Sequence, residues 1–115
     1  MQNLEQERAC HALKQSKEKN FSRQDVSKLP ALILGNGLLA TAAFALDGRS
    51  RSRMAAAMDA IADHLANRKL TKKRSAEEML DELSTKNSLN LRLATEEALA
   101  YLVYLKRFAR NDQEK

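Results

Sequence analysis

The hydrophobic pattern of the chain contains one long uncharged stretch, residues 29–46, between segments that are rich in charge. Its length reaches the lower limit for crossing a bilayer, but Pro30 and the run Gly35, Asn36 and Gly37 divide it into pieces too short to span one. We therefore expect this stretch to form a central helix or a broken helix pair in a small hydrophobic core.

Two local signals mark the starts of helices on either side of this stretch. Ser22 with Asp25, and Ser75 with Glu78, have the form of a capping box, in which a serine and an acid three residues later satisfy the first free N–H groups of a helix. Pro30 lies two turns after the first box, where it either kinks that helix or begins a new one.

Apolar residues also recur at helical spacing in residues 2–17, 54–65, 76–83 and 91–109, and the last pattern is the longest, covering about five turns. Only 4% of the residues are aromatic, so Leu, Ile, Met and Ala must build the core, which favours close-packed helices over sheets. We predict an all-α fold, a single compact helical bundle of about five or six helices over residues 1–115, with a frayed tail from about residue 111.

The net charge of +5 is unevenly distributed along the chain. Residues 48–74 contain eight Lys or Arg against two Asp, a net charge of +6, so the remainder carries −1. A basic field confined to one segment indicates a surface that meets a polyanion, because solubility does not require clustered charges.

The first basic cluster is the stronger candidate for binding phosphate. Arg49, Arg51 and Arg53 crowd the start of a predicted helix, and no acid follows them before Asp59. These cations repel one another and the positive end of the helix, so a bound phosphate would relieve both repulsions. No aromatic side chains for stacking bases lie nearby, so we expect contacts to the nucleic-acid backbone.

The second basic cluster is Lys72, Lys73 and Arg74. It precedes a helix whose first turn carries Glu77 and Glu78, so binding of a polyanion and local neutralisation both remain open for it.

No arrangement of reactive side chains predicts catalysis. Cys10 and His11 are adjacent, so on a helix they point about 100° apart and cannot form a nucleophile–base couple. His64 has no second His or Cys at helical spacing. We therefore expect no enzymatic activity, no metal and no cofactor. The single cysteine excludes an internal disulfide, and we expect no signal peptide and a cytoplasmic location.

Three segments of the chain, in their order and spacing, match a known pattern: residues 4–9 (Leu-Glu-Gln-Glu-Arg-Ala), residues 29–38 (Leu-Pro-Ala-Leu-Ile-Leu-Gly-Asn-Gly-Leu) with Ala43 and Phe44, and residues 90–99 (Asn-Leu-Arg-Leu-Ala-Thr-Glu-Glu-Ala-Leu) leading to 104–109 (Tyr-Leu-Lys-Arg-Phe-Ala). Together they resemble the small, all-helical fifth subunit of Cmr-type (type III-B) CRISPR effector complexes. Two positions depart from the family, Leu91 where an aromatic is expected and Tyr104 where Trp is expected.

The resemblance implies a non-catalytic structural subunit of an RNA-guided complex for antiviral defence. Several copies would stack along a filament of larger backbone subunits and line the groove in which guide RNA pairs with target RNA. The implied partners are the other Cmr subunits, especially the backbone subunit, neighbouring copies of this chain, and the two RNAs through backbone contacts, with no membrane. The residues on motif positions, which are candidate interface or RNA contacts, are Arg8, Arg92, Lys106 and Arg107.

Simpler roles remain open for some of these positions. Arg92 and Glu96 are spaced to form an ion pair on a helix surface, and Lys106 and Arg107 suit the last turn of a helix. Two other functions compete with the subunit role: a small helix-turn-helix DNA-binding regulator, and a protein-interaction bundle whose basic segment meets an acidic partner.

Overall fold

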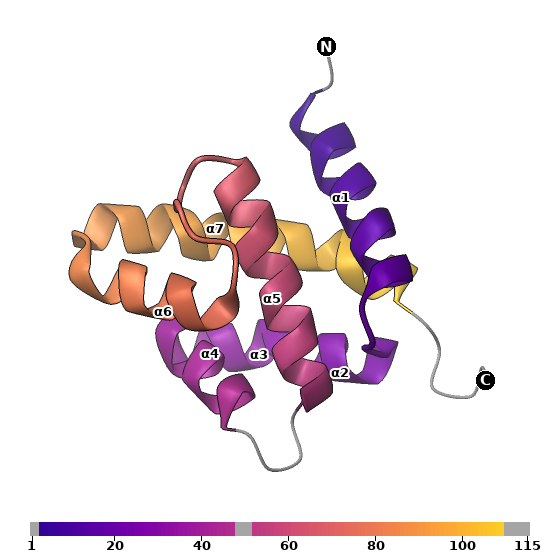
Figure 1. The fold of residues 1–115 in the computed structure, drawn as a ribbon, viewed down its shortest axis with the longest axis horizontal. Coiled ribbons are helices and arrows are strands. Elements are labelled where there is room, and N and C mark those ends of the chain that lie inside the picture. Colours follow the sequence, from indigo (N-terminus) through magenta and orange to yellow (C-terminus); the bar gives the residue numbers. More distant parts are fainter. Residues whose placement is uncertain (1–2, 48–51, 110–115) are drawn as a thin grey trace.

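The computed structural model describes residues 3–47 and 52–109, and the regular secondary structure in these ranges is helical throughout (Figure 1). The predicted all-α class is confirmed. The helices are α1 (Leu4–Glu18), α2 (Arg23–Ser27), α3 (Leu29–Asn36), α4 (Leu38–Leu46), α5 (Ser52–Asn67), α6 (Ala76–Thr85) and α7 (Ser88–Phe108). The described residues form seven helices where about five or six were expected, and the helix expected after Ser22 is the short α2, with a separate α3 after it.

Local capping explains where several helices begin. Ser22 and Asp25 form the predicted capping box at the start of α2, with each side chain bonded to the other residue's backbone N–H. At α6 the Ser75 hydroxyl accepts from the Glu78 N–H at 3.2 Å, as predicted, but the Glu78 carboxylate accepts from the Ser75 hydroxyl at 3.1 Å instead of from backbone. Asn87 caps α7 through the N–H of Asn90.

The uncharged stretch is a broken helix pair, as expected. Pro30 lies in the first turn of α3, where its missing N–H has no intrahelical partner to lose, so it begins a helix instead of kinking one. Gly37 separates α3 from α4 and adopts φ of 95°, a left-handed conformation that glycine tolerates better than other residues.

The centre of the core, however, is α5 and not the uncharged stretch. Met58, Ile61 and Leu65 of α5 are fully buried, whereas α3 and α4 leave Leu34 and Phe44 exposed by 74% and 41%. Helix α5 is central because it contacts five other helices, α1, α2, α4, α6 and α7. Residues 29–46 contribute one buried face to this core through Leu29, Ile33, Leu38, Ala42 and Ala45.

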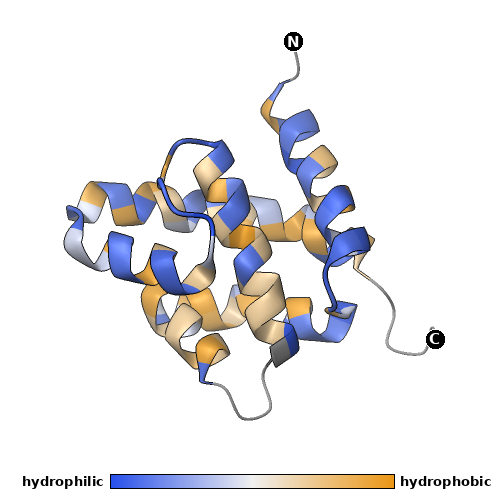
Figure 2. Cartoon of the chain, viewed as in Figure 1, coloured by the Kyte–Doolittle hydropathy of each residue, from blue (hydrophilic) through white to orange (hydrophobic). Residues whose placement is uncertain are grey.

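Helix α7 is the longest element, and α5 crosses in front of it in the view of Figure 1. Helix α1 packs mainly against α7, while α4 lies against α5 and α6. Hydropathic colouring shows α3 and α4 as the most apolar region and much of α1 and α6 as polar (Figure 2). Within residues 3–47 and 52–109, no helix combines the length and the apolarity needed to cross a membrane.

Candidate nucleic-acid interface

The first basic cluster is described only at Arg53, because Arg49 and Arg51 lie outside the described residues. The Arg53 guanidinium forms an ion pair with Asp25 of α2, with 3.1 Å between Nε and Oδ2. The expected absence of a neutralising acid is therefore wrong for Arg53. The acid comes from a helix that lies 28 residues earlier in the chain, which local charge counting cannot detect.

The second basic cluster forms the loop between α5 and α6, and Glu82 holds that loop in place. The Glu82 carboxylate accepts from the backbone N–H groups of Lys72 and Lys73 at 2.9 to 3.1 Å and pairs with Lys86 at 2.7 Å. Burial alone would raise the pKa of Glu82, but these hydrogen bonds outweigh it and hold that pKa below its ordinary value. The side chains of Lys72 and Lys73 are exposed, so the loop presents two lysines from a fixed backbone.

Arg74 turns back towards α5. Its Nη1 donates to Asn67 Oδ1 at 2.7 Å and to Asp63 Oδ1 at 3.0 Å. Glu77 and Glu78 were expected to neutralise the second basic cluster, but they are not its partners in the structure. Its partners are Glu82, Asp63 and Asn67.

The candidate residues on α7 have different environments. Arg92 pairs with Glu96 at 3.3 Å on an exposed surface, so the predicted ion pair between them is confirmed. Lys106 and Arg107 are exposed and line a groove of about 460 Å³ together with Arg23 of α2. The apolar floor of this groove is made by Pro30, Leu99, Leu102 and Val103.

Arg8 is engaged inside the fold. Its Nε and Nη2 donate to the two oxygens of Glu97 at 2.7 and 2.8 Å, and only 21% of its side chain is exposed. The hydrogen bonds that Arg8 donates to the Glu97 carboxylate raise the pKa of Arg8 above its ordinary value, so this cation is held between α1 and α7.

This ion pair belongs to a larger polar network that joins α1, α5 and α7. His11 lies 2.6 Å from both the Tyr101 hydroxyl and Asp63 Oδ2, through Nδ1 and Nε2 respectively. His64 Nε2 lies 2.8 Å from Glu97 Oε2, and the His64 ring stacks on Tyr101 with 4.2 Å between centroids. We call these six residues the polar network: Arg8, His11, Asp63, His64, Glu97 and Tyr101.

Electrostatics within the polar network favour one arrangement of protons. Burial, and then the charge of Asp63, raise the pKa of Tyr101, so its hydroxyl keeps a proton to donate. A neutral His11 that donates from Nε2 to Asp63 leaves Nδ1 to accept from Tyr101. Burial would raise the pKa values of Asp63 and Glu97, but hydrogen bonds hold both pKa values below their ordinary values. Asp63 accepts from His11 and Arg74, and Glu97 accepts from Arg8 and His64.

Sequence reasoning missed this network because its members are far apart in the chain. His11 and Tyr101 are 90 residues apart, and His11 and Asp63 are 52 apart. One signal was present: Glu97 falls on the apolar face of α7, between Ala94 and Tyr101, where an unpaired acid would be costly.

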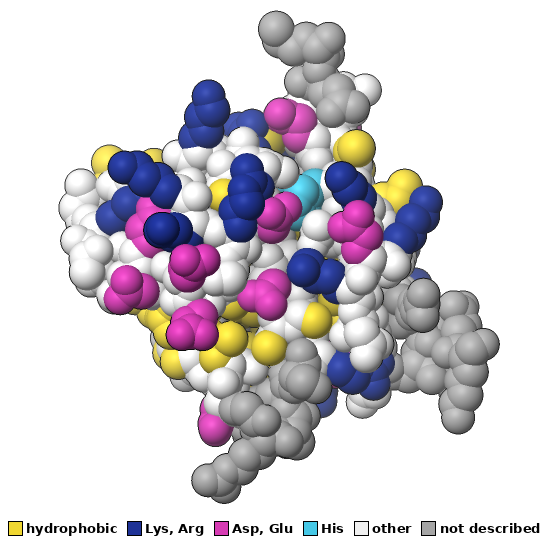
Figure 3. All heavy atoms as spheres, viewed as in Figure 1, with side chains coloured by type: hydrophobic (Ala, Val, Ile, Leu, Met, Phe, Trp, Pro, Cys, Tyr) yellow, Lys and Arg dark blue, Asp and Glu magenta, His cyan; other side chains and the backbone are white. Residues whose placement is uncertain are grey.

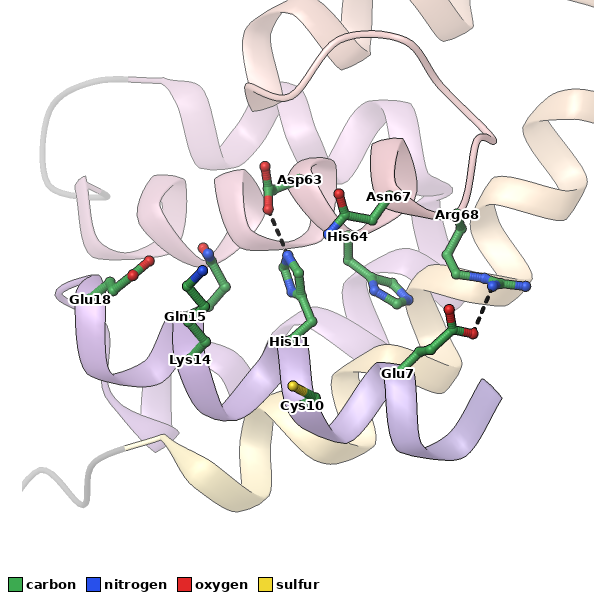
Figure 4. A pocket seen from close by; sticks show the side chains of 10 residues that line it. All are labelled: Glu7, Cys10, His11, Lys14, Gln15, Glu18, Asp63, His64, Asn67 and Arg68. Atoms are coloured by element: carbon green, nitrogen blue, oxygen red, sulfur yellow. Dashed lines mark hydrogen bonds and ion pairs between the residues drawn. The ribbon is translucent and has the colours of Figure 1, made fainter. Parts of the chain in front are cut away.

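A groove of about 570 Å³ runs between α1 and α5 above the polar network (Figure 4). At one end Glu7 pairs with Arg68 at 3.0 Å, and His11 with Asp63 forms the middle. Figure 3 shows a histidine on this face of the molecule, with both basic and acidic side chains beside it. The lining residues are Glu7, Cys10, His11, Lys14, Gln15, Glu18, Asp63, His64, Asn67 and Arg68.

Among the described residues, no group of three or more His, Cys, Asp or Glu is arranged to hold a metal ion. The polar network instead uses its ionisable side chains to pair with one another.

Comparison with known proteins adds one finding. The family model described as CRISPR-associated protein (Cas_Cmr5) matches residues 4–111, a range that contains every helix from α1 to α7. A search of curated proteins gives no match, and a search of solved structures gives none either.

Proposed function

The chain belongs to the Cmr5 family of CRISPR-associated proteins and is thus a Cmr complex subunit, and on this premise we propose that its role there is structural and not catalytic. Copies of the chain stack along the backbone subunit in the cytoplasm and line the groove that holds guide and target RNA. The complex as a whole serves antiviral defence.

The observation that carries the RNA-lining role is a gathering of cations from separate helices on one face. Lys14 of α1 and Arg68, which directly follows α5, line the α1–α5 groove beside the acids Glu7, Glu18 and Asp63. The loop after α5 adds Lys72, Lys73 and Arg74. Ion pairs hold Arg68 and Arg74 in place, and Glu82 holds the backbone of the two loop lysines. Fixed cations of this kind suit phosphate contacts that are insensitive to sequence.

A second surface supports contact with a protein partner. The groove at the C-terminal end of α7 has an apolar floor that includes Val103, which is 64% exposed, and a rim formed by Arg23, Lys106 and Arg107. An apolar centre with a charged rim is the usual anatomy of a protein interface, so we assign this groove to a neighbouring subunit.

The DNA-binding regulator is the less favoured function. A helix-turn-helix protein places a recognition helix carrying base-reading side chains in the major groove. The outer side of the short helix α6 exposes Glu77, Glu78 and Asp81, which are not the Arg, Asn or Gln side chains that commonly read base edges.

Gentle purification of the tagged chain from its native host tests the subunit role. We expect a large complex with larger subunits and a short RNA of uniform length. Recovery of the chain alone, or with fragments of genomic DNA, would contradict the proposal and favour the regulator.

The double variant Lys72→Ala/Lys73→Ala tests the RNA-lining face. We expect the assembled complex to retain RNA less well, and its salt dependence to flatten by about 0.7 for each phosphate that the variant no longer binds. Lys17→Ala/Lys28→Ala is the matched control, because it removes the same charge from two exposed lysines that line neither of the two grooves described above. Equal effects of the two variants would show that net charge alone matters.

The predicted contact at Arg49, Arg51 and Arg53 has its own test. The triple Ala variant is expected to lower RNA retention if the segment binds phosphate, and unchanged retention with an unchanged salt slope would exclude it. Because Arg53 pairs with Asp25, Arg53→Ala alone separates the effect of breaking that ion pair from an effect on RNA binding.

A further inference from the structure

Helix α1 contributes little to the hydrophobic core for its length. Of its 15 residues, all of which the structure describes, only Ala12 belongs to the cluster of buried apolar side chains. The five-residue α2 gives Val26 to that cluster, and the ten-residue α6 gives Ala76, Met79 and Leu83. Because burial of apolar surface is the main source of folding stability, α1 depends more than these helices on polar contacts.

Polar contacts join α1 to its neighbours at the edge of the bundle (Figure 1). Besides the bonds that α1 makes within the polar network, Glu7 pairs with Arg68 at 3.0 Å. The carboxylate of Glu5 accepts from the Tyr104 hydroxyl of α7 at 3.1 Å. Each hydrogen bond contributes little net free energy, because water replaces the partner when the two groups separate. Helix α1 is therefore held in one place, but less strongly than the helices that build the core.

The chain is anchored again directly after α1. Phe21 and Ser22 are each 2% exposed, and Ser22 caps α2. Between this anchor and the end of α1 lie Lys19 and Asn20, and the backbone of Lys19 is extended. Separation of α1 therefore needs new backbone angles at these two residues, and it leaves the anchor of α2 undisturbed.

We propose that α1 is a detachable strap, which separates from α5 and α7 about Lys19 and Asn20 while α2 to α7 remain folded, and that acid releases it by protonating His64. The site under the strap holds the stacked rings of His64 and Tyr101, and the His11 ring lies 5.3 Å from each of them. Both stacked side chains are at most 1% exposed while α1 is docked. The strap thus controls the access of water and protons to this pair.

The surroundings of His64 explain why acid acts on the strap. Burial lowers the pKa of His64 and outweighs the hydrogen bond and charge of Glu97, which would raise it, while nearby cationic groups lower it further. When α1 separates, water reaches the ring, so its pKa moves towards the ordinary value of 6.5. Below that pH the open form takes up a proton that the closed form resists, so acid favours opening. The titratable and charged groups around His64 are Arg8 and His11 of α1, Asp63 of α5, Arg68 directly after α5, and Glu97 and Tyr101 of α7.

Native-state hydrogen exchange on the full chain measures the opening. A helix of 15 residues is marginal in water by itself, so the amides of a released α1 should exchange together. At about pH 7.5 we expect one shared opening constant for the amides of α1, larger than that of α5 by a factor on the order of 100. Protection equal to that of α5 would overturn the strap, and so would protection that rises gradually from the N-terminus, which is fraying.

Acidification tests the trigger. After correction for the intrinsic exchange rate, we expect the opening constant of α1 to rise by up to about tenfold between about pH 7.5 and about pH 5.5. That is the factor for one proton taken up with the ordinary pKa of 6.5 in the open form alone. An equal rise for the amides of α5 would show global unfolding instead of release of α1, and no rise would exclude the acid trigger.

Three variants assign the effects to residues. His64→Gln keeps a donor for Glu97 but does not titrate, so the strap should lose most of its acid response. A full response in His64→Gln would overturn the assigned trigger. Tyr101→Phe keeps the stacked ring and removes the hydroxyl that bonds His11, so the opening constant of α1 alone should rise on the order of fivefold. Arg92→Ala, on the exposed side of the same helix, is the control and should change neither constant. An unchanged α1 in Tyr101→Phe would contradict a strap held by polar contacts.

Discussion

His11 and Gln15 lie one helical turn apart on α1 and line the same groove, yet they differ in whether their polar atoms have hydrogen-bond partners. Both ring nitrogens of His11 have partners at 2.6 Å, and these partners lie on α5 and α7. Gln15 Oε1 is as deeply buried and has no partner among the described residues. We conclude that the polar network holds three helices together, whereas the Gln15 side chain contributes no hydrogen bond between described residues.

The largest expected effect comes from removing the centre of the polar network. Glu97→Ala takes the carboxylate away from Arg8 and His64, and leaves the partly buried Arg8 and the fully buried His64 without this acceptor. We expect a loss of about 3 kcal/mol in the free energy of unfolding, at the lower end for a broken buried ion pair because Arg8 keeps 21% of its side chain exposed.

Urea denaturation measures this loss. Glu97→Gln is the matched variant, because it keeps an acceptor oxygen while removing the charge, and it should cost less. A loss below about 1 kcal/mol for Glu97→Ala would mean that water replaces the carboxylate and that the network contributes little to stability.

Acidification is expected to act next most strongly, through three groups of the polar network at once. The pKa values of Asp63 and Glu97 lie below their ordinary values in the folded chain, so the stability that depends on their charge is present at neutral pH and is lost as pH falls through the acid range. Burial lowers the pKa of His64, so below its ordinary value of 6.5 the unfolded chain takes up a proton that the folded chain resists.

Both effects have the same sign, so the unfolding temperature should fall steadily between about pH 7 and about pH 4. Repeating the titration on Glu97→Ala is the control, and that variant should lose part of the slope. A parent chain whose stability is flat across this range would contradict the assigned ion pairs.

We expect a smaller change in stability, of the opposite sign, from substituting Gln15 in the same groove. Gln15→Met removes the buried oxygen without removing a hydrogen bond between described residues, so we expect it to stabilise the chain by about 1 kcal/mol. The same denaturation experiment measures it. A destabilised Gln15→Met chain would show that the amide already has a partner that stabilises the fold.

The smallest effect is expected on the outer surface. Arg92→Ala breaks an exposed pair with Glu96 at 3.3 Å, which should cost no more than about 0.5 kcal/mol. This variant sets the baseline for the series. If it costs as much as Glu97→Ala, burial does not explain the difference between the two ion pairs.

The sequence predicted interactions between residues that are close together in the chain, and it missed interactions between residues that are far apart. The start of α2 was predictable because Ser22 and Asp25 lie three residues apart and bond to each other's backbone. The break at Gly37 was predictable for the same reason, since a left-handed residue between helices has a local signature. The family was identified from short motifs in their correct order, and the match over residues 4–111 confirms it.

Interactions between distant helices escaped the same reasoning. Asp25 neutralises Arg53, and Asp63 orients Arg74, only after α2, α5 and the following loop have packed together. The polar network and the orphaned oxygen of Gln15 exist only in the packed structure. Residues 29–46 were expected at the centre of the core because they are apolar. A helix lies at the centre when other helices surround it, and α5 is surrounded in this way, whereas residues 29–46 leave Leu34 and Phe44 exposed.

The separation between Arg8 and Glu97 has a consequence for the order of events at the ribosome. The two residues are 89 positions apart, so at typical elongation rates Glu97 is synthesised on the order of 5 to 20 s after Arg8. During that interval α1 has none of its hydrogen-bond partners on α7, which are Glu97, Tyr101 and Tyr104. Docking of α1 on α7 must close a loop of almost the whole chain. The N-terminal helix is thus made first, but its packing against α7 can be completed only when nearly the whole chain has been made.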